Sequence, residues 1–485
     1  MSMDSIRKKT IIGLFWAFAE KVGAQVISFV VSIVLARLLM PEEYGVISIV
    51  LVITSLCDVF VDSGFGRALI QAKDTDEQDY SSAFWCGLVV SLVIYVGLFL
   101  SAPAIGRFYR MELLGPVIRV MGLRVVLASY SSVLKAKVSR QMDFKQFFFS
   151  SLGGTLFSAV VGIVMAYSGC GVWALAAQNM VDAVVDTVVL AITVRWYPGF
   201  VFSFQRVKRL FGYGWKVLAA SLIDTLYDNF RSLYIGRLYT ADDLAFYTRG
   251  KQFPNLLADN INSSISSVLF PAIASQGEDK VARKTMTRRA MKTSAYILTP
   301  MLCGLAAIAE PLVVLVLTEK WLPCVPYLQI LCINYALVPL QTANLQAIYA
   351  CGRSDICLKL NIIKKSFGLL MVLIFARISV LAMAWAGVVS GVFSLFMNTF
   401  PNRKLIDYHL TEQLWDVAPC WLISGVMMVL VNITGQIPMA MLPKLALMIL
   451  VGGISYILLS LLFRVESFFY LWNLIHHSGR NKDKA

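Results

Sequence analysis

Charged side chains interrupt an apolar stretch of the sequence at residues 221–237. Asp224 and Asp228 are four residues apart, and Arg231 follows seven residues after Asp224. At about 100° per residue, these three side chains share one face of an α-helix. The stretch is otherwise apolar enough to enter a membrane, where charged groups are costly and typically mark a transport pathway or a binding site. The spacing therefore predicts a functional polar face inside the membrane.

Other apolar stretches show the same pattern, with polar residues at helical spacing. These residues are Glu20, Lys21 and Gln25; Asp58 and Asp62; Asn179, Asp182 and Asp186; Asp259, Asn262, Ser263 and Ser266; Gln341 and Asn344; and Asn361, Lys364 and Lys365. By contrast, the stretches at 80–103, 146–167 and 441–463 are almost purely apolar inside. This asymmetry indicates a hydrated cavity that selected helices line while the others face lipid.

The cations of this set indicate the chemistry of a cargo. Lys21, Arg231, Lys364 and Lys365 are predicted to bind an anionic cargo such as a phosphate or a uronic acid. A second set is predicted to neutralise these cations or to bind a coupling proton or sodium ion: Glu20, Gln25, Asp58, Asp62, Asp182, Asp224, Asp228, Asp259 and Asn262. For any single residue the alternative is a structural pair between packed helices, for instance Asp228 with Lys365.

Composition places these faces in a polytopic membrane protein. The 485 residues are 58% hydrophobic and 15% charged, whereas a soluble domain averages about 25% charged residues. The net charge of +14 lies in short loops, which argues against a nucleic-acid partner. The nine cysteines and three histidines show no spacing typical of a metal site or a disulfide framework. The first apolar run has no cleavage site and is predicted to be an uncleaved span.

Hydropathy predicts an all-α chain of about fourteen transmembrane helices with short loops, which leaves no room for a soluble catalytic domain. The predicted spans are 11–38, 44–66, 80–103, 113–137, 146–167, 171–194, 215–238, 254–275, 293–317, 323–350, 356–376, 379–400, 414–433 and 441–463. Most Lys and Arg residues outside these spans lie at one set of ends, and few lie at the other. This bias predicts that both termini are cytoplasmic. The tail at residues 463–485 reads as an amphipathic segment at the membrane surface.

An internal repeat appears at an offset of 200 residues. ARLLMPEEY at 36–44 aligns without a gap with GRLYTADDL at 236–244, and each copy ends a span and leads into a short acidic loop. The first span thus corresponds to the seventh, which predicts two pseudo-symmetric six-helix lobes with a cargo site between them. The predicted divisions are an N-terminal lobe at 1–200, a C-terminal lobe at 201–412, and two extra helices with a tail at 413–485.

The chain resembles the Wzx-type polysaccharide transporter family of the MOP flippase superfamily, in particular colanic-acid exporter-like oligosaccharide flippases. The resemblance extends through nearly the whole chain. The stretches that show it are LARLLMPEEYG (35–45), DVFVDSGFGRALIQ (58–71), LYTADDLAFYTRGKQFP (238–254), SSVLFPAIA (266–274) and LTEKWLPCVPYLQILC (317–332). It implies a V-shaped MATE-like pair of lobes in the bacterial inner membrane.

The resemblance also implies a function, namely a flippase that moves undecaprenyl-diphosphate-linked oligosaccharide repeat units for capsule, O-antigen or exopolysaccharide synthesis. Expected partners are this substrate and membrane lipids, together with a polysaccharide polymerase and a chain-length regulator. No cofactor is expected, and transport is driven by H⁺, by Na⁺ or by the membrane potential alone, which favours outward movement of an anion by about 2.3 kcal/mol per charge per 100 mV.

Other functions fit the residues less well. A MATE-like drug antiporter would use the acids to bind a cationic cargo, but the cations at mid-depth argue against it. A membrane enzyme such as a polymerase or an O-antigen ligase would need a large outer loop, which the sequence lacks. A simple channel would leave the repeat unexplained, and the chain contains no G-x-x-x-x-G-K-[ST] motif for ATP. We therefore expect a transporter rather than an enzyme.

Overall fold

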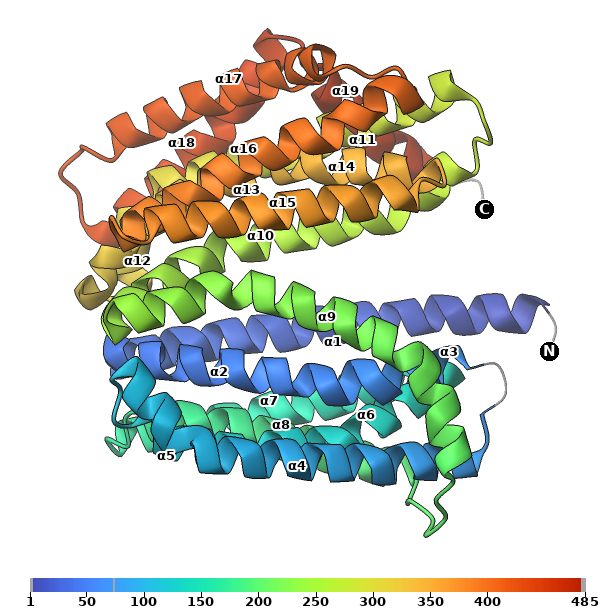
Figure 1. Cartoon of the computed structure of the whole chain (residues 1–485). Coiled ribbons are helices and arrows are strands. Elements are labelled where there is room, and N and C mark those ends of the chain that lie inside the picture. Colours follow the sequence, from blue (N-terminus) through green and yellow to red (C-terminus); the bar gives the residue numbers. More distant parts are fainter. Residues whose placement is uncertain (1–2, 73–74, 481–485) are drawn as a thin grey trace. The chain divides into compact units, whose positions relative to one another are not determined.

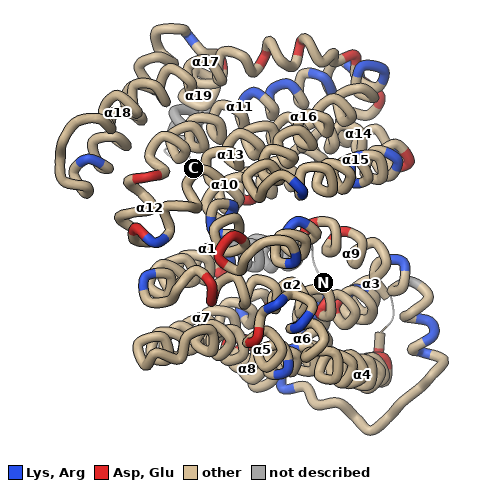
Figure 2. Tube along the Cα trace, turned by 60° about the vertical axis from the view of Figure 1, so that its left-hand side comes forward, with Lys and Arg blue, Asp and Glu red and all other residues tan. Residues whose placement is uncertain are grey.

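The computed structural model describes residues 3–72 and 75–480, and these residues form only helices and their connections (Figure 1). The chain divides into two compact units, Met1–Ala245 (unit 1) and Phe246–Ala485 (unit 2). Among these described residues, ten helical segments are long and apolar enough to cross a membrane, or eleven if the bent pair at Lys280–Leu317 forms one span. Figure 2 shows long stretches of α7 and α18 without a charged residue, as expected for lipid-facing helices.

Unit 1 contains nine α-helices, one π-helical turn (η1) and the start of a tenth α-helix. They are α1 (Met3–Leu38), α2 (Pro41–Val61), η1 (Asp62–Gly66), α3 (Arg67–Gln71), α4 (Glu77–Tyr109), α5 (Leu114–Met121), α6 (Leu123–Gln141), α7 (Phe144–Tyr167), α8 (Val172–Val194), α9 (Phe204–Leu238) and α10 (Ala241–Ala274), which continues into unit 2. Within this unit, α7 packs closely against α1 and α8, and α6 packs against α4 and α8.

Helix α9 belongs to the packing of unit 1. It contacts α2, η1, α3 and α4, and small residues permit this approach: a Cβ at Gly214 would overlap the carbonyl oxygen of Gly64. The boundary between the compact units at residues 245 and 246 therefore differs from the predicted lobe boundary at 200 and 201. The division into lobes and extra helices remains a prediction from the repeat.

Unit 2 contains the rest of α10, eight further α-helices before the tail helix α19, and a 3₁₀ turn. They are α11 (Lys280–Ala307), α12 (Ala309–Leu317), η2 (Glu319–Cys324), α13 (Val325–Tyr335), α14 (Val338–Ala350), α15 (Ser354–Phe375), α16 (Val380–Leu405), α17 (Leu410–Thr434), α18 (Met441–Leu462) and α19 (Glu466–Arg480). Arg288 on α11 donates to Asp416 on α17 at 2.5 Å. Lys292, also on α11, forms an ion pair with Glu466 at the start of α19. These contacts tie α17 and the tail helix to α11.

All fourteen predicted ranges coincide with helices, but the count of fourteen spans is not confirmed. Helices α9, α10 and α15 are not among the helices apolar enough to be counted as membrane spans, because each contains several charged residues in its apolar region. The predicted break between the spans 356–376 and 379–400 is confirmed, since α15 ends at Phe375 and α16 begins at Val380.

The two copies of the repeat have the same helix boundaries. α1 ends at Leu38 and α2 begins at Pro41, while α9 ends at Leu238 and α10 begins at Ala241. The acidic residues after each junction cap the next helix: the Glu43 carboxylate accepts from the Met40 amide at 2.7 Å, and the Asp243 carboxylate accepts from the Thr240 hydroxyl at 2.7 Å. Such side chains satisfy amides that would otherwise lack partners at a helix start.

Candidate functional site

Two basic residues of α6 lie inside unit 1 beside the acids of its polar faces. The Arg124 Nε atom lies 3.8 Å from Asp58 Oδ2, and the Lys135 Nζ atom lies 3.0 Å from Asp186 Oδ2. The side chains of Asp58 and Asp186 are about four-fifths buried. Because α6 packs against both α2 and α8, it places one base against each acidic helix.

Three further acids complete this arrangement, and each lies beside a serine of a neighbouring helix. The pairs are Glu20 with Ser151, Asp62 with Ser132, and Asp182 with Ser158. Lys135 lies within electrostatic range of all three acids. We call the set of Glu20, Asp58, Asp62, Asp182, Asp186, Arg124 and Lys135 the unit 1 charge cluster.

Local backbone features allow the helices of the cluster to approach. Asp62 begins the π-helical turn η1, and such turns inside α-helices are frequent at functional sites. Gly66 ends the turn, and a Cβ there would overlap the Ser132 hydroxyl. On the other side, a Cβ at Gly154 would lie 3.1 Å from the Asp182 carboxylate. Glycine at both positions therefore leaves room for the Ser132 hydroxyl and for the Asp182 carboxylate.

The charges of the cluster are unbalanced, because five carboxylates share two bases. Asp58 Oδ1 is buried and makes no hydrogen bond with the described part of the chain. Like charges crowded in a poorly solvated site favour uptake of a proton or a cation. Among the described residues, no three His, Cys, Asp or Glu side chains converge in a geometry that could hold a metal ion.

The four predicted cargo-binding cations lie in both units. Lys21 on α1 and Arg231 on α9 lie in unit 1, whereas Lys364 and Lys365 lie on α15 in unit 2. Lys364 Nζ donates a hydrogen bond to Asn398 Oδ1 at 2.8 Å. A common site for the four remains a prediction.

The other predicted polar residues lie on three helices. Gln25 is half-buried on α1, and Asp224 and Asp228 lie on an accessible face of α9. In unit 2, Asp259 accepts from the Asn255 amide at 2.6 Å, and Asn262 accepts from the Thr342 hydroxyl of α14. The contact with Thr342 joins Asn262 to a predicted polar helix, so α10 and α14 share a polar interface.

Sequence reasoning missed both bases of the charge cluster. Both residues lie inside the predicted span 113–137, Lys135 near its end among other cations, and the spacing arguments give neither of them a role. A signal was available: the two residues are eleven apart, close to three helical turns, which places them on one face of a helix. Their partners Asp58 and Asp186 are distant in sequence, so only folding shows the pairs.

The chain belongs to the family described as "Polysaccharide biosynthesis protein", whose model matches residues 34–326. Among curated relatives, the teichuronic acid biosynthesis protein TuaB of Bacillus subtilis is 25% identical and the match covers 94% of this chain and 96% of TuaB. The lipopolysaccharide biosynthesis protein WzxC of Escherichia coli is 26% identical over 74% of each chain. The succinoglycan biosynthesis transport protein ExoT of Rhizobium meliloti is 26% identical over 67% of this chain and 65% of ExoT.

Solved structures show the same fold. The lipid II flippase MurJ in an inward closed conformation superimposes with a TM-score of 0.77, at 12% identity, over 93% of this chain and 99% of MurJ. An inward-facing multidrug-resistance transporter of the MATE family, within the MOP superfamily, superimposes with a TM-score of 0.63, at 15% identity, over 79% of this chain and 96% of that one. These comparisons confirm the resemblance to Wzx-type flippases and the MOP fold. The names of the relatives describe biosynthesis and transport proteins, which agrees with a transporter rather than an enzyme.

Proposed function

We propose that the protein is a flippase that moves undecaprenyl-diphosphate-linked oligosaccharide repeat units from the cytoplasmic to the periplasmic leaflet of the bacterial inner membrane. The family membership and the MurJ-like fold support this proposal. The observation that carries it is the retention of charged side chains inside an apolar helical protein, as at Asp58 with Arg124 and Asp186 with Lys135. A charged diphosphate and its sugars need such a hydrated path, because they cannot cross hydrocarbon unaided.

The proposed mechanism is alternating access by fourteen spans in two lobes, with both termini cytoplasmic. Lys21, Arg231, Lys364 and Lys365 bind the diphosphate or another acidic group of the cargo, since guanidinium and ammonium groups form strong hydrogen bonds with oxyanions. The prenyl tail stays in lipid throughout. A polymerase and a chain-length regulator act on the exported unit.

A transport assay tests the cargo site. Purified protein is reconstituted in liposomes with a lipid-linked oligosaccharide, and its appearance in the opposite leaflet is measured with an added glycosidase. Lys21→Gln, Arg231→Gln, Lys364→Gln and Lys365→Gln each remove one predicted contact. Because a hydrogen bond to a charged group contributes about 1.5–3 kcal/mol, we expect rates to fall about tenfold or more.

Lys444→Gln is the matched control, because Lys444 lies at the start of α18, an otherwise uncharged helix. Its transport rate should equal that of the wild type. Wild-type rates in all four cargo variants, with equal amounts of protein in the membrane, would contradict the proposed cation site.

We further propose that the unit 1 charge cluster exchanges a coupling proton or sodium ion. Asp58 is the best-placed member, because its Oδ1 atom is buried and makes no hydrogen bond with the described residues. Asp58→Asn should abolish transport, or the transport that remains should no longer respond to a proton or sodium gradient. Asp355→Asn at the start of α15 is the control. Full activity of Asp58→Asn with an intact gradient response would show that the cluster is structural.

A MATE-like cation antiporter is the second candidate, favoured by the excess of acids in the charge cluster and by the MATE fold neighbour. The same liposomes distinguish the two functions. An antiporter would exchange a cationic dye for protons and would depend on Asp58, while Lys21→Gln and Arg231→Gln would have no effect on it.

A further inference from the structure

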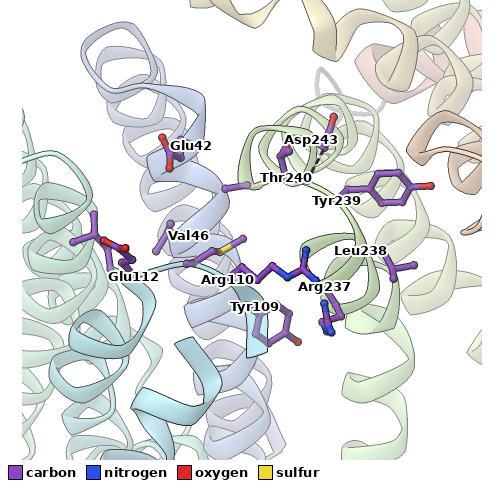
Figure 3. Close-up of a pocket in the computed structure, with 13 residues that line it drawn as sticks. Glu42, Val46, Tyr109, Arg110, Glu112, Arg237, Leu238, Tyr239, Thr240 and Asp243 are labelled. Carbon is purple, nitrogen blue, oxygen red and sulfur yellow. Dashed lines mark hydrogen bonds between the residues drawn. The ribbon is translucent and has the colours of Figure 1, made fainter. Parts of the chain in front are cut away.

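A cavity of about 760 Å³ lies at one end of unit 1, away from the charge cluster (Figure 3). Three segments of the chain form it: the start of α2, the connection from α4 to α5, and the connection from α9 to α10. Its lining residues are Glu42, Val46, Tyr109, Arg110, Met111, Glu112, Leu113, Arg237, Leu238, Tyr239, Thr240, Ala241 and Asp243. This end of unit 1 is opposite the end where α4 begins, and neither the charge cluster nor the predicted cargo-binding cations lie in the cavity lining.

Two arginines meet in this cavity. Figure 3 shows the side chains of Arg110 and Arg237 pointing toward one another. Among the described residues, no carboxylate forms an ion pair within 4.0 Å of either guanidinium group. The Arg237 guanidinium lies 4.6 Å from the centroid of the Phe108 ring, which supports it on one side. Two like charges that face each other without a counter-ion leave a place for an anion.

The backbone holds Arg110 in this position. Arg110 is the C-cap residue after α4 and has the left-handed conformation, with φ 58° and ψ 37°, which a non-glycine residue adopts infrequently. The backbone amide of Arg110 donates to the carbonyl of Arg107 at 3.3 Å, and the backbone amide of Met111 donates to the carbonyl of Gly106 at 3.1 Å. The turn therefore directs Arg110 away from the axis of α4 and toward the end of α9.

The acids of the cavity do not neutralise the arginines. Asp243 is engaged as a helix cap, accepting from the Thr240 hydroxyl at 2.7 Å. Glu42 and Glu112 lie apart from the arginine pair in Figure 3. Carboxylates in such positions are hydrogen-bond acceptors for hydroxyl groups. The cavity thus has a cationic side for an oxyanion and acidic sides for hydroxyl groups.

We infer that this cavity binds a phosphate ester with neighbouring hydroxyl groups, and that Arg110 and Arg237 hold the phosphate. The planar fork of a guanidinium group matches the geometry of phosphate oxygens, and two such groups match the near-double charge of a phosphate monoester. A sugar phosphate is such a monoester, and phosphatidylglycerol, a diester with one negative charge, shares with it an oxyanion beside hydroxyl groups. The inference concerns binding, so it does not depend on the transport function proposed above.

Native mass spectrometry of the full chain in detergent tests the site with three separate probes: inorganic phosphate, glucose 1-phosphate and phosphatidylglycerol. Arg110→Gln and Arg237→Gln should each weaken binding of at least one probe about tenfold or more, because each loses a charge-assisted contact. Arg107→Gln is the matched control: this arginine lies one turn from Arg110 on the same helix but outside the cavity lining. Its affinities should stay within about twofold of the wild type.

The pattern of loss identifies the source of the phosphate. Loss confined to phosphatidylglycerol would support a lipid headgroup site, and loss confined to glucose 1-phosphate and inorganic phosphate would support a site for a sugar phosphate. Arg237→Lys, which keeps the charge but loses the fork, should show an intermediate loss in either case and guards against misfolding of the Gln variants. Unchanged affinity for all three probes in Arg110→Gln/Arg237→Gln would overturn the inference.

Discussion

At the scale of single residues, the Asp58–Arg124 pair is expected to be sensitive to substitution. Arg124 is about one-third exposed and Asp58 about one-fifth exposed, and their closest atoms are 3.8 Å apart. Removing one member of a largely buried pair leaves the other charge without compensation, which costs about 3–5 kcal/mol when both are fully buried. Because this pair is partly accessible, a smaller cost applies.

We predict that Arg124→Gln lowers the free energy of unfolding by about 1–2 kcal/mol and that Asp58→Asn in the same chain restores most of the loss. Thermal unfolding of the four proteins of this double-mutant cycle measures the coupling. Additive effects of the two changes would show that Arg124 does not compensate Asp58.

At the scale of helices, an ion-pair network joins the start of α9 to the start of α4. Asp76 and Asp79 form a capping box at the start of α4. Arg206 of α9 forms ion pairs with both acids, and Arg209 donates to Asp79 at 2.8 Å. Figure 1 shows the first part of α9 bending toward this end of α4. The network fixes the path of the chain between α8 and α9.

This network predicts a loss of stability in acid. The hydrogen bond from Arg206 lowers the pKa of Asp76, which lies in the loop before α4, to about 2. The pKa of an unfolded Asp is about 3.9. A carboxyl group with a lowered pKa stabilises the fold above its unfolded value, and that contribution is lost as the pH falls from about 4 toward 2.

Hydrogen exchange of residues 195–210, measured at pH 5 and pH 3 and corrected for intrinsic rates, checks this prediction. The segment should lose protection at the lower pH in the wild type, and Asp76→Asn should show the lower protection already at pH 5. Asp355→Asn, which removes the exposed partner of Arg353 in unit 2, is the control and should not change this segment. Equal protection at both pH values in the wild type would contradict a stabilising role of the Arg206 pair.

At the scale of the whole molecule, the orientation in the membrane is testable with a native cysteine. Cys170 lies between α7 and α8 and is the one exposed cysteine of the nine. Lysines and arginines concentrate at the opposite ends of the helices, so the charge bias predicts that Cys170 lies on the periplasmic side.

We expect a membrane-impermeant maleimide added to spheroplasts to label Cys170, because an exposed thiol at the outer surface is within its reach. Cys170→Ser should remove the labelling, since the other cysteines are buried or half-buried. Labelling that requires inside-out vesicles would reverse the predicted orientation and place both termini outside.

Much of the architecture follows from local sequence. Apolar runs about as long as the membrane is thick become helices, because a backbone in lipid must satisfy its own hydrogen bonds. All fourteen predicted ranges therefore coincide with helices, and the repeat marks the junctions at Leu38–Pro41 and Leu238–Ala241 correctly. The polar faces of Asp58 and Asp182 could also be predicted, since helical spacing alone places such residues together.

Tertiary packing decides which charges meet. Lys135 meets Asp186, and Arg124 meets Asp58, because α6 packs between helices that are distant in sequence. The π-helical turn at Asp62 and the approach of Gly214 to Gly64 likewise depend on neighbouring helices rather than on local propensity. The meeting of Arg110 and Arg237 also appears only in the folded unit, since 126 intervening residues separate them in the chain. Periodicity shows which side of a helix a residue faces, but the partner on that side is set by the packing of the chain.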